Sequence, residues 1–131
     1  PSADGTYTGA AYEGVRLLPM LADKCNFILE PLFGFSSPEA IGVPITALGA
    51  AGAATSMASQ LVTTGLAGAG DIAVFTAMCM CWSGYLSTHV SMMNSLNCNH
   101  LINKALFSHT IGGLCAGIAA HWIYVLLGLI L

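Results

Sequence analysis

Charged side chains are scarce in this sequence, and they almost vanish over its longer part. Only 7% of the 131 residues are charged, whereas an average soluble domain has roughly 25%. After Glu39 the chain has only Asp71 and Lys104. So few charges cannot cover the surface of a soluble core, which excludes an ordinary water-soluble globular protein.

Basic residues and catalytic motifs are also lacking. Three Lys and Arg residues with a net charge of −3 provide no basic stripe for phosphates, so we expect no nucleic-acid partner. They also leave the membrane orientation open, because the positive-inside rule has almost nothing to count. No nucleophile turn, no phosphate loop and no pair of histidines one helical turn apart occurs, so we expect no enzyme, no metal site and no cofactor.

What the sequence has instead is three long uncharged runs, at residues 40–70, 72–103 and 105–131. Each run exceeds the ~20 residues that an α-helix needs to cross the hydrocarbon of a bilayer. We therefore expect an all-α integral membrane protein, with a polar lead-in at residues 1–14 and a single membrane domain at residues 15–131.

The segment before the first run, residues 15–35, is apolar but interrupted by charges and prolines. It predicts two short amphipathic pieces at the membrane surface or in a protein-lined site. Ser37 precedes Pro38 and Glu39, which is the pattern of a helix N-cap followed by its first turn.

Residues 40–70 fit neither one membrane span nor two. One straight helix would be ~46 Å long, and two spans would need ~40 residues plus a turn. The centre of the run, Gly49–Ser56, has almost no large side chains. This favours a re-entrant hairpin of two half-helices that meet near the midplane, inside protein or a wet cavity. A single tilted helix with a Gly-rich packing face is the alternative.

Asp71 stands where an N-cap is needed for an apolar helix over residues 72–86. Residues 87–100 are too polar for lipid and too poorly charged for a typical soluble loop. A broken helix lining a polar pocket has this composition, and an ordinary loop between two spans is the alternative.

The last run predicts a span over residues 114–131, divided from residues 101–111 by Gly112 and Gly113. Gly113 and Gly117 form a small-xxx-small pair that allows another helix to approach closely. Gly49 and Gly52 are the corresponding packing candidates in the first run.

Side chains that could hold a solute are hydroxyls and amides rather than acids and bases. Of four histidines, His89 stands out because hydroxyls flank it, whereas His121 beside Trp122 has the setting of an interfacial residue. Met78–Cys81 holds four sulfur side chains, but neighbours on a helix point to different faces, which favours core packing. The predicted substrate-binding residues are Thr55, Ser56, Gln60, Ser83, Ser87, Thr88, His89, Ser91 and Asn94.

Two blocks of sequence resemble a known family. The segments 84–93 (GYLSTHVSMM) and 108–113 (SHTIGG), with Glu30–Gly34 before the Gly/Ala-rich run, are similar to the nucleoside-recognition, or Gate, domain family. The nearest likeness is to its small inner-membrane members, which are related to spore maturation proteins A and B. One departure is that relatives usually have another apolar span where Leu17-Leu18-Pro19 here runs almost directly into Asp23.

The resemblance implies a Gate-type half of a transporter in a bacterial cytoplasmic membrane. Such a subunit would move a small polar organic solute (nucleoside-like, amino-acid-like or an organic acid) by alternating access. It would act with a second Gate-type subunit or as a homo-oligomer, and a coupling ion such as Na⁺ or H⁺ is possible. The alternatives are a non-transporting assembly or regulatory subunit, and a component of a metal-ion permease that uses Cys79, Cys81, Met92 and Met93.

Overall fold

The computed structural model describes residues 17–130, and every regular element within them is a helix. In chain order the elements are α1 (Leu17–Phe33), η1 (Pro38–Ile41), α2 (Gly42–Gly49), α3 (Ala51–Thr63), α4 (Ala69–Trp82), α5 (Tyr85–Ser95), η2 (Asn99–Leu101) and α6 (Ile102–Ile130). The all-helical prediction is therefore confirmed for this part of the chain. The lead-in at residues 1–14 lies outside it.

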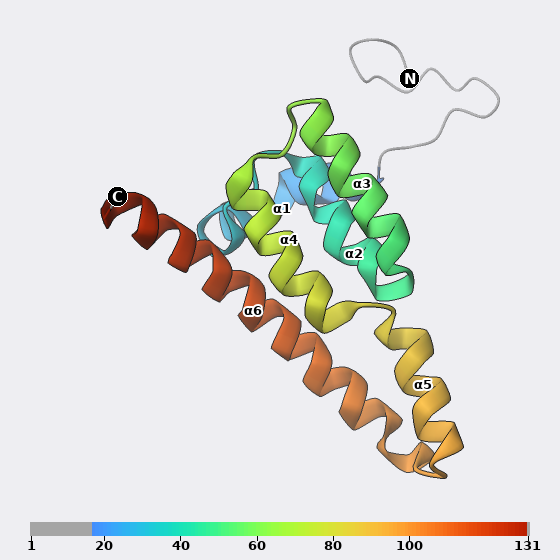
Figure 1. Cartoon of the computed structure of the whole chain (residues 1–131). Coiled ribbons are helices and arrows are strands. Elements are labelled where there is room, and N and C mark those ends of the chain that lie inside the picture. The colour runs from blue at the N-terminus through green and yellow to red at the C-terminus, as the bar shows by residue number, and fades with distance from the viewer. Residues whose placement is uncertain (1–16, 131) are drawn as a thin grey trace, which may run out of the picture.

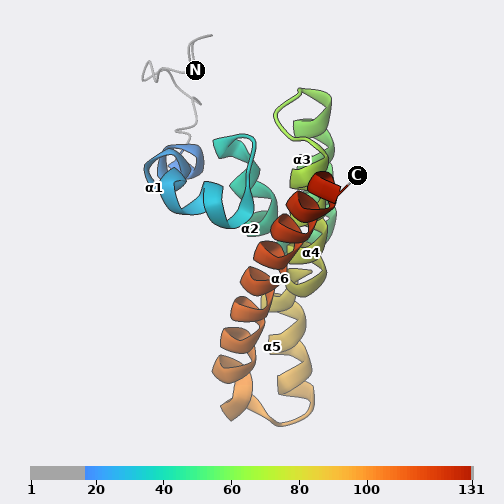
Figure 2. The ribbon, with the colours of Figure 1, turned by 90° about the vertical axis from the view of Figure 1, so that its left-hand side faces the viewer.

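The molecule consists of a body and an arm (Figure 1). The body is formed by α1 to α4, and the arm is formed by α5, η2 and the N-terminal part of α6. Figures 1 and 2 show α6 running along the whole molecule, first beside α5 and then beside α4. Helix α6 therefore connects the arm to the body.

The core is small and lies where α4 packs on α2, α3 and α6. Val43 of α2, Ala54 of α3 and Val74 of α4 are all fully buried. The other buried apolar residues are Phe33, Ala40, Ala47, Leu61, Ala67, Phe75, Met78 and Trp82. A core of so few large side chains leaves most of the apolar residues on the outside.

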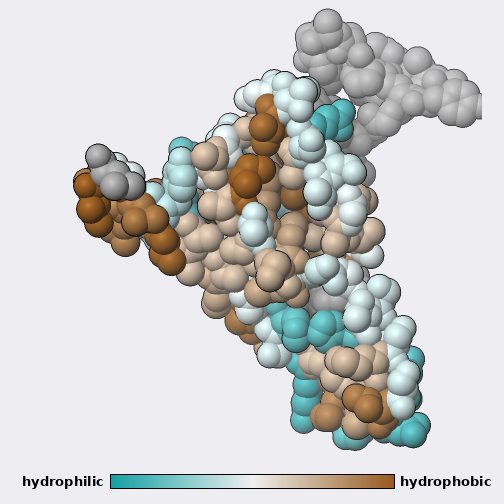
Figure 3. Space-filling model, in the orientation of Figure 1, coloured by the Kyte–Doolittle hydropathy of each residue, from teal (hydrophilic) through white to brown (hydrophobic). Residues whose placement is uncertain are grey.

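Helix α6 is the one helix in the described residues that is long and apolar enough to cross a membrane. Its 29 residues extend ~44 Å at 1.5 Å per residue. Only 11% of its most apolar stretch is buried, which distinguishes it from the core helix of a soluble protein. Figure 3 shows its C-terminal end as strongly hydrophobic surface, and Trp122, Leu126 and Ile130 are all about half exposed or more.

The run after η1 forms a helical hairpin, so the alternative of one tilted helix is wrong. Helices α2 and α3 lie side by side and antiparallel, with one extended residue, Ala50, between them (Figure 1). Met57 of α3 packs against Gly42 and accepts a hydrogen bond from the Thr46 hydroxyl at 3.7 Å. The two half-helices have 8 and 13 residues, and residues 51–56 of the Gly/Ala-rich centre are helical.

The N-terminal segment differs from the prediction of two short pieces. Residues 17–33 form one continuous helix that includes Pro31. A proline so near the C-terminal end removes one backbone bond, and Pro19 lies in the first turn, where the N–H would lack a helical partner anyway. Ser37 does stand at the N-cap position, of η1, but its side chain makes no capping bond.

The polar run after α4 is a helix, so the alternative of an ordinary loop is wrong for residues 85–95. The break predicted in this region occurs at Ser83 and Gly84, earlier than expected. Helix α4 also begins before Asp71, with Gly68 at its N-cap. Asp71 caps the helix from its third residue, where its carboxylate accepts the Gly68 N–H at 2.8 Å.

Helix α6 is continuous through Gly112 and Gly113, so the predicted division there is wrong. Each glycine costs a helix up to ~1 kcal/mol relative to alanine. The long contact with α4 outweighs this cost, because Gly113 lies under the Trp82 indole and Gly117 lies against Met78 and Phe33.

Candidate functional site

The two places where helices are interrupted meet in space. The Gly84 N–H, in the break between α4 and α5, donates to the Ala47 carbonyl near the end of α2 at 2.8 Å. The ends of α2 and α4 and the beginnings of α3 and α5 therefore surround one junction (Figure 1). We refer to residues 47–51 and 82–85 as the junction.

The chain breaks at Gly84 because the backbone there is left-handed. Its φ of +61° is readily available to glycine, and it interrupts the helix between α4 and α5, which continue in roughly the same direction (Figure 1). An added Cβ at Gly84 would lie 3.8 Å from the Gly49 carbonyl oxygen. The turn is thus close to the hairpin end as well as bonded to it.

Backbone dipoles give the junction its electrostatic character. Helices α3 and α5 begin there, so their first N–H groups have no partner within the helix and carry partial positive charge. Helices α2 and α4 end there with carbonyl groups of partial negative charge. Such a meeting of four helix ends can bind both the positive and the negative parts of a polar solute without any charged side chain.

One predicted substrate-binding residue lies in the junction and two lie directly beside it. Ser83 is exposed in the break itself. Ser87 and Thr88 follow in the first turn of α5, where their hydroxyl oxygens would be 3.7 and 3.6 Å from a Cβ on Gly84. The Ser87 hydroxyl donates to the Gly84 carbonyl at 3.0 Å, which leaves its lone pairs as acceptors.

A groove of about 290 Å³ runs between α3 and α4 on the hairpin side of the body. Thr55, Ser59 and Thr76 contribute hydroxyls to it, and Val43 and Phe75 form part of its apolar wall. Thr55 lies one turn from the start of α3, so this end of the groove approaches the junction. Its volume is at the small end of the range for ligand sites.

The remaining predicted residues lie farther along their helices. Ser56 and Gln60 are exposed on α3, and Ser91 and Asn94 are exposed on α5, about one to three helical turns from the breaks. The Ser56 hydroxyl donates to the Gly52 carbonyl within its own helix. The nine residues therefore form a line that passes through the junction rather than one pocket.

The four glycines divide into two pairs. A Cβ on Gly113 or Gly117 would collide with side chains of α4, so these glycines allow α4 and α6 to approach. Gly49 and Gly52 have open space beside them.

The sulfur side chains of Met78–Cys81 do not converge on one point, since Met78 is buried and Met80 is 80% exposed.

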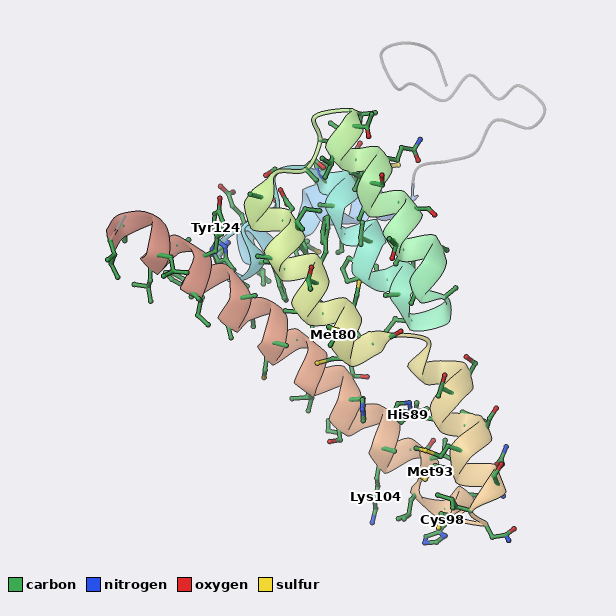
Figure 4. The ribbon with its side chains drawn as sticks, in the orientation of Figure 1. Met80, His89, Met93, Cys98, Lys104 and Tyr124 are labelled. Carbon is green, nitrogen blue, oxygen red and sulfur yellow. The ribbon has the colours of Figure 1, made fainter. Side chains whose placement is uncertain are left out.

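His89 of α5 contacts His109 of α6, a pairing that the sequence did not indicate. Their Nε2 atoms are 3.2 Å apart, and both side chains are half-buried. Figure 4 shows His89 on the side of α5 that faces α6, one turn beyond the junction. The two residues are 20 positions apart, so no local spacing could have shown the contact.

A second unforeseen contact fixes the body. The Asp71 carboxylate is 1% exposed and accepts the Ser36 N–H at 2.9 Å and the Ser36 hydroxyl at 2.6 Å, besides the Gly68 N–H. The only acidic residue after Glu39 thus connects the loop after α1 to the start of α4. Three donors of the fold thus bind this carboxylate and satisfy both of its oxygens.

No cluster of three or more His, Cys, Asp or Glu side chains that could hold a metal occurs within residues 17–130. No family model matches this chain, and no curated protein or solved structure is significantly similar to it.

Proposed function

We propose that this chain is a subunit of a membrane transporter for a small polar organic solute. The observation that carries the proposal is the junction, where two interrupted helical segments meet through the Gly84–Ala47 hydrogen bond. Many secondary transporters bind their solutes between discontinuous helices of this kind near the bilayer midplane. The hydroxyls of Ser83, Ser87 and Thr88 add donors and acceptors at the same place.

The membrane setting of the proposal is supported by α6 and by the hairpin. Helix α6 is long and apolar enough to span, and ten of its large apolar side chains, between Phe107 and Ile130, are exposed. Helices α2 and α3 extend only ~12 and ~20 Å, so neither reaches across ~30 Å of hydrocarbon. In a bilayer they would be re-entrant, with the junction at their inner end.

A transport pathway needs more spanning helices than residues 17–130 supply. One full-length span cannot enclose a solute on all sides, so we propose that a second Gate-type subunit or a second copy of the chain completes the site. The resemblance of residues 84–93 and 108–113 to the Gate family supports the same arrangement. The hairpin would move against the α4–α5 break to expose the junction alternately to the two sides.

Water access to the junction tests this proposal. In a variant whose five native cysteines are replaced by alanine, Thr55→Cys or Ser87→Cys is introduced, and the protein is placed in lipid nanodiscs. A charged, membrane-impermeant maleimide should label both cysteines, because a solute site must be wet. The matched control is Leu126→Cys, on the exposed face of α6, which should stay unlabelled in lipid.

Labelling of Leu126→Cys would contradict the membrane setting. Protection of Thr55→Cys and Ser87→Cys would contradict a solute path and favour a non-transporting assembly subunit.

Uptake of uridine, alanine and malate into vesicles from cells with and without the chain then tests transport directly. Ser87→Ala should reduce uptake of the transported solute, and unchanged uptake would remove Ser87 from the site.

A further inference from the structure

Helices α4 and α5 follow α6 in one antiparallel register that continues across the break at Gly84 (Figures 1 and 2). At one end, a Cβ on Gly70 would lie 3.1 Å from the Tyr124 ring, so the start of α4 meets the C-terminal part of α6. At the other end, His89 of α5 contacts His109, nearer the beginning of α6. The two shorter helices therefore form one interrupted column beside the long helix.

The charged residues of these three helices stand only at the two ends of the register. Asp71 follows Gly70 at the start of α4, and Lys104 lies in the first turn of α6. Tyr124 lies at the level of Gly70, and the residues from Lys104 to Tyr124 extend ~30 Å at 1.5 Å per residue. The hydrocarbon of a bilayer is ~30 Å thick. An uncharged layer of membrane thickness thus crosses both columns.

The turn between α5 and α6, which we call the arm tip (residues 96–104), is polar and exposed. The asparagines at 97, 99 and 103 and the side chains of His100 and Lys104 are all exposed. Figure 3 shows hydrophilic surface at this end of the molecule. No acidic residue follows Asp71 in the sequence, so no side chain of α5, η2 or α6 can neutralise Lys104. Its counterion comes from outside the arm.

Lys104 stands at the end of an exposed apolar face of α6. Phe107 lies three residues further on, Ile111 and Leu114 follow at helical spacing, and all three are exposed. A basic side chain in this position buries its methylene stem beside acyl chains and places its ammonium group among the lipid phosphates. Figure 4 shows Lys104 at the arm end of α6, pointing away from α5. A phospholipid headgroup therefore fits both the charge and the position.

We propose that α4 and α5 together form a second, interrupted membrane crossing beside α6. The arm tip then lies in the phospholipid headgroup layer at the surface opposite the α3–α4 loop (residues 64–68), and Lys104 binds lipid phosphate there. This crossing rests on the membrane setting of the proposed function and does not require transport. Helix α6 is longer than the uncharged layer, and tilt accommodates such a helix. The polar side chains of α5, such as Ser91 and Asn94, face the subunit that completes the site.

The sidedness of two single cysteines tests the second crossing. In a variant whose five native cysteines are replaced by alanine, Asn99→Cys lies in the arm tip and Thr63→Cys lies at the end of α3, both at exposed positions. A membrane-impermeant maleimide is applied to right-side-out and to inverted membrane vesicles from cells that produce the full chain. Each cysteine should be labelled in one preparation only, and the two in opposite preparations.

Labelling of both cysteines in the same preparation alone would put the arm tip and the α3–α4 loop on one side and would overturn the crossing, as would labelling of either one in both preparations. A chain that moves no solute gives the same expected pattern, so failure of transport is distinguished from failure of the crossing.

Asn103→Cys and Phe107→Cys locate the headgroup layer. The first should be labelled, and the second, one helical turn deeper, should stay protected. Labelling of Phe107→Cys as fast as Asn103→Cys would place the arm in water and contradict the proposal.

Lys104→Gln tests the contact with lipid phosphate. Binding of phosphatidylglycerol to the purified full chain is measured by native mass spectrometry. Removal of the charge should weaken this binding about 5-fold, which is the contribution of one basic residue near an anionic membrane surface. Lys104→Arg is the matched control, because it retains the charge, and it should bind as the unaltered chain does. Equal binding by Lys104→Gln would overturn the contact and point to an acidic partner chain as the counterion.

Discussion

Asp71→Ala should lower the free energy of unfolding by about 3 kcal/mol or more, since a hydrogen bond to a charged group contributes ~1.5–3 kcal/mol and three such bonds are lost. The substitution removes the acceptor of the Ser36 N–H, the Ser36 hydroxyl and the Gly68 N–H at once. It also removes a negative charge from the first turn of α4, where the helix dipole stabilises it. Thermal unfolding in detergent, followed by circular dichroism, measures the effect.

Asp23→Ala is the matched control, because Asp23 is the same residue type on an exposed face of α1. Its effect should lie within ~0.5 kcal/mol of zero, as for most surface substitutions. Ser36→Ala removes only the 2.6 Å hydroxyl bond and should cost ~1.5–3 kcal/mol, as a hydrogen bond to a charged group does. If Asp71→Ala is no more damaging than Asp23→Ala, the carboxylate does not hold the loop to α4.

The hairpin could be predicted because chain length and membrane thickness constrain it. A run of 31 uncharged residues is too long for one span and too short for two, and the Gly/Ala-rich centre marked the region of the turn. The sequence could not place the turn at Ala50 alone. That position depends on how Met57 packs against Gly42, which is a contact between residues 15 apart.

The predicted helix limits were wrong where tertiary packing outweighed local propensity. Gly112-Gly113 should end a helix by propensity alone, yet α6 continues because Gly113 is where the Trp82 indole packs. Pro31 was among the prolines expected to interrupt this segment, but it lies in the last turn of α1, so the bond it removes affects only the end of the helix. Propensity describes an isolated segment, and the outcome at Gly113 was decided by the side chain that packs against it.

The candidate site was predictable in composition but not in arrangement. Ser87 and Thr88 were identified from the polar run, and the structure places them beside the Gly84 break. The bond from Gly84 to Ala47, the contact of His89 with His109 and the bond from Asp71 to Ser36 join residues 20 or more positions apart. Such contacts have no period in the sequence, so only the fold reveals them.

Two adjacent glycines of α6 should respond in opposite directions to the same substitution. A Cβ on Gly113 would collide with the Trp82 Nε1 atom, so Gly113→Ala must displace the indole. Displacement also breaks the 3.0 Å hydrogen bond from Trp82 to the His109 carbonyl. Overpacking of a tight contact costs ~1–3 kcal/mol, and the lost bond costs about 1 kcal/mol more. Against a gain in helix propensity of up to ~1 kcal/mol, Gly113→Ala should destabilise the protein by about 2 kcal/mol.

Gly112→Ala makes the same chemical change where nothing lies within 4 Å of the new Cβ. Only the propensity gain remains, so this variant should be more stable than the unaltered chain by up to ~1 kcal/mol. Fluorescence in a Trp122→Phe background reports on Trp82 directly, since the chain has two tryptophans. The indole emission should shift in Gly113→Ala and stay constant in Gly112→Ala. Equal stability of the two variants would mean that α4 and α6 do not pack closely at Gly113.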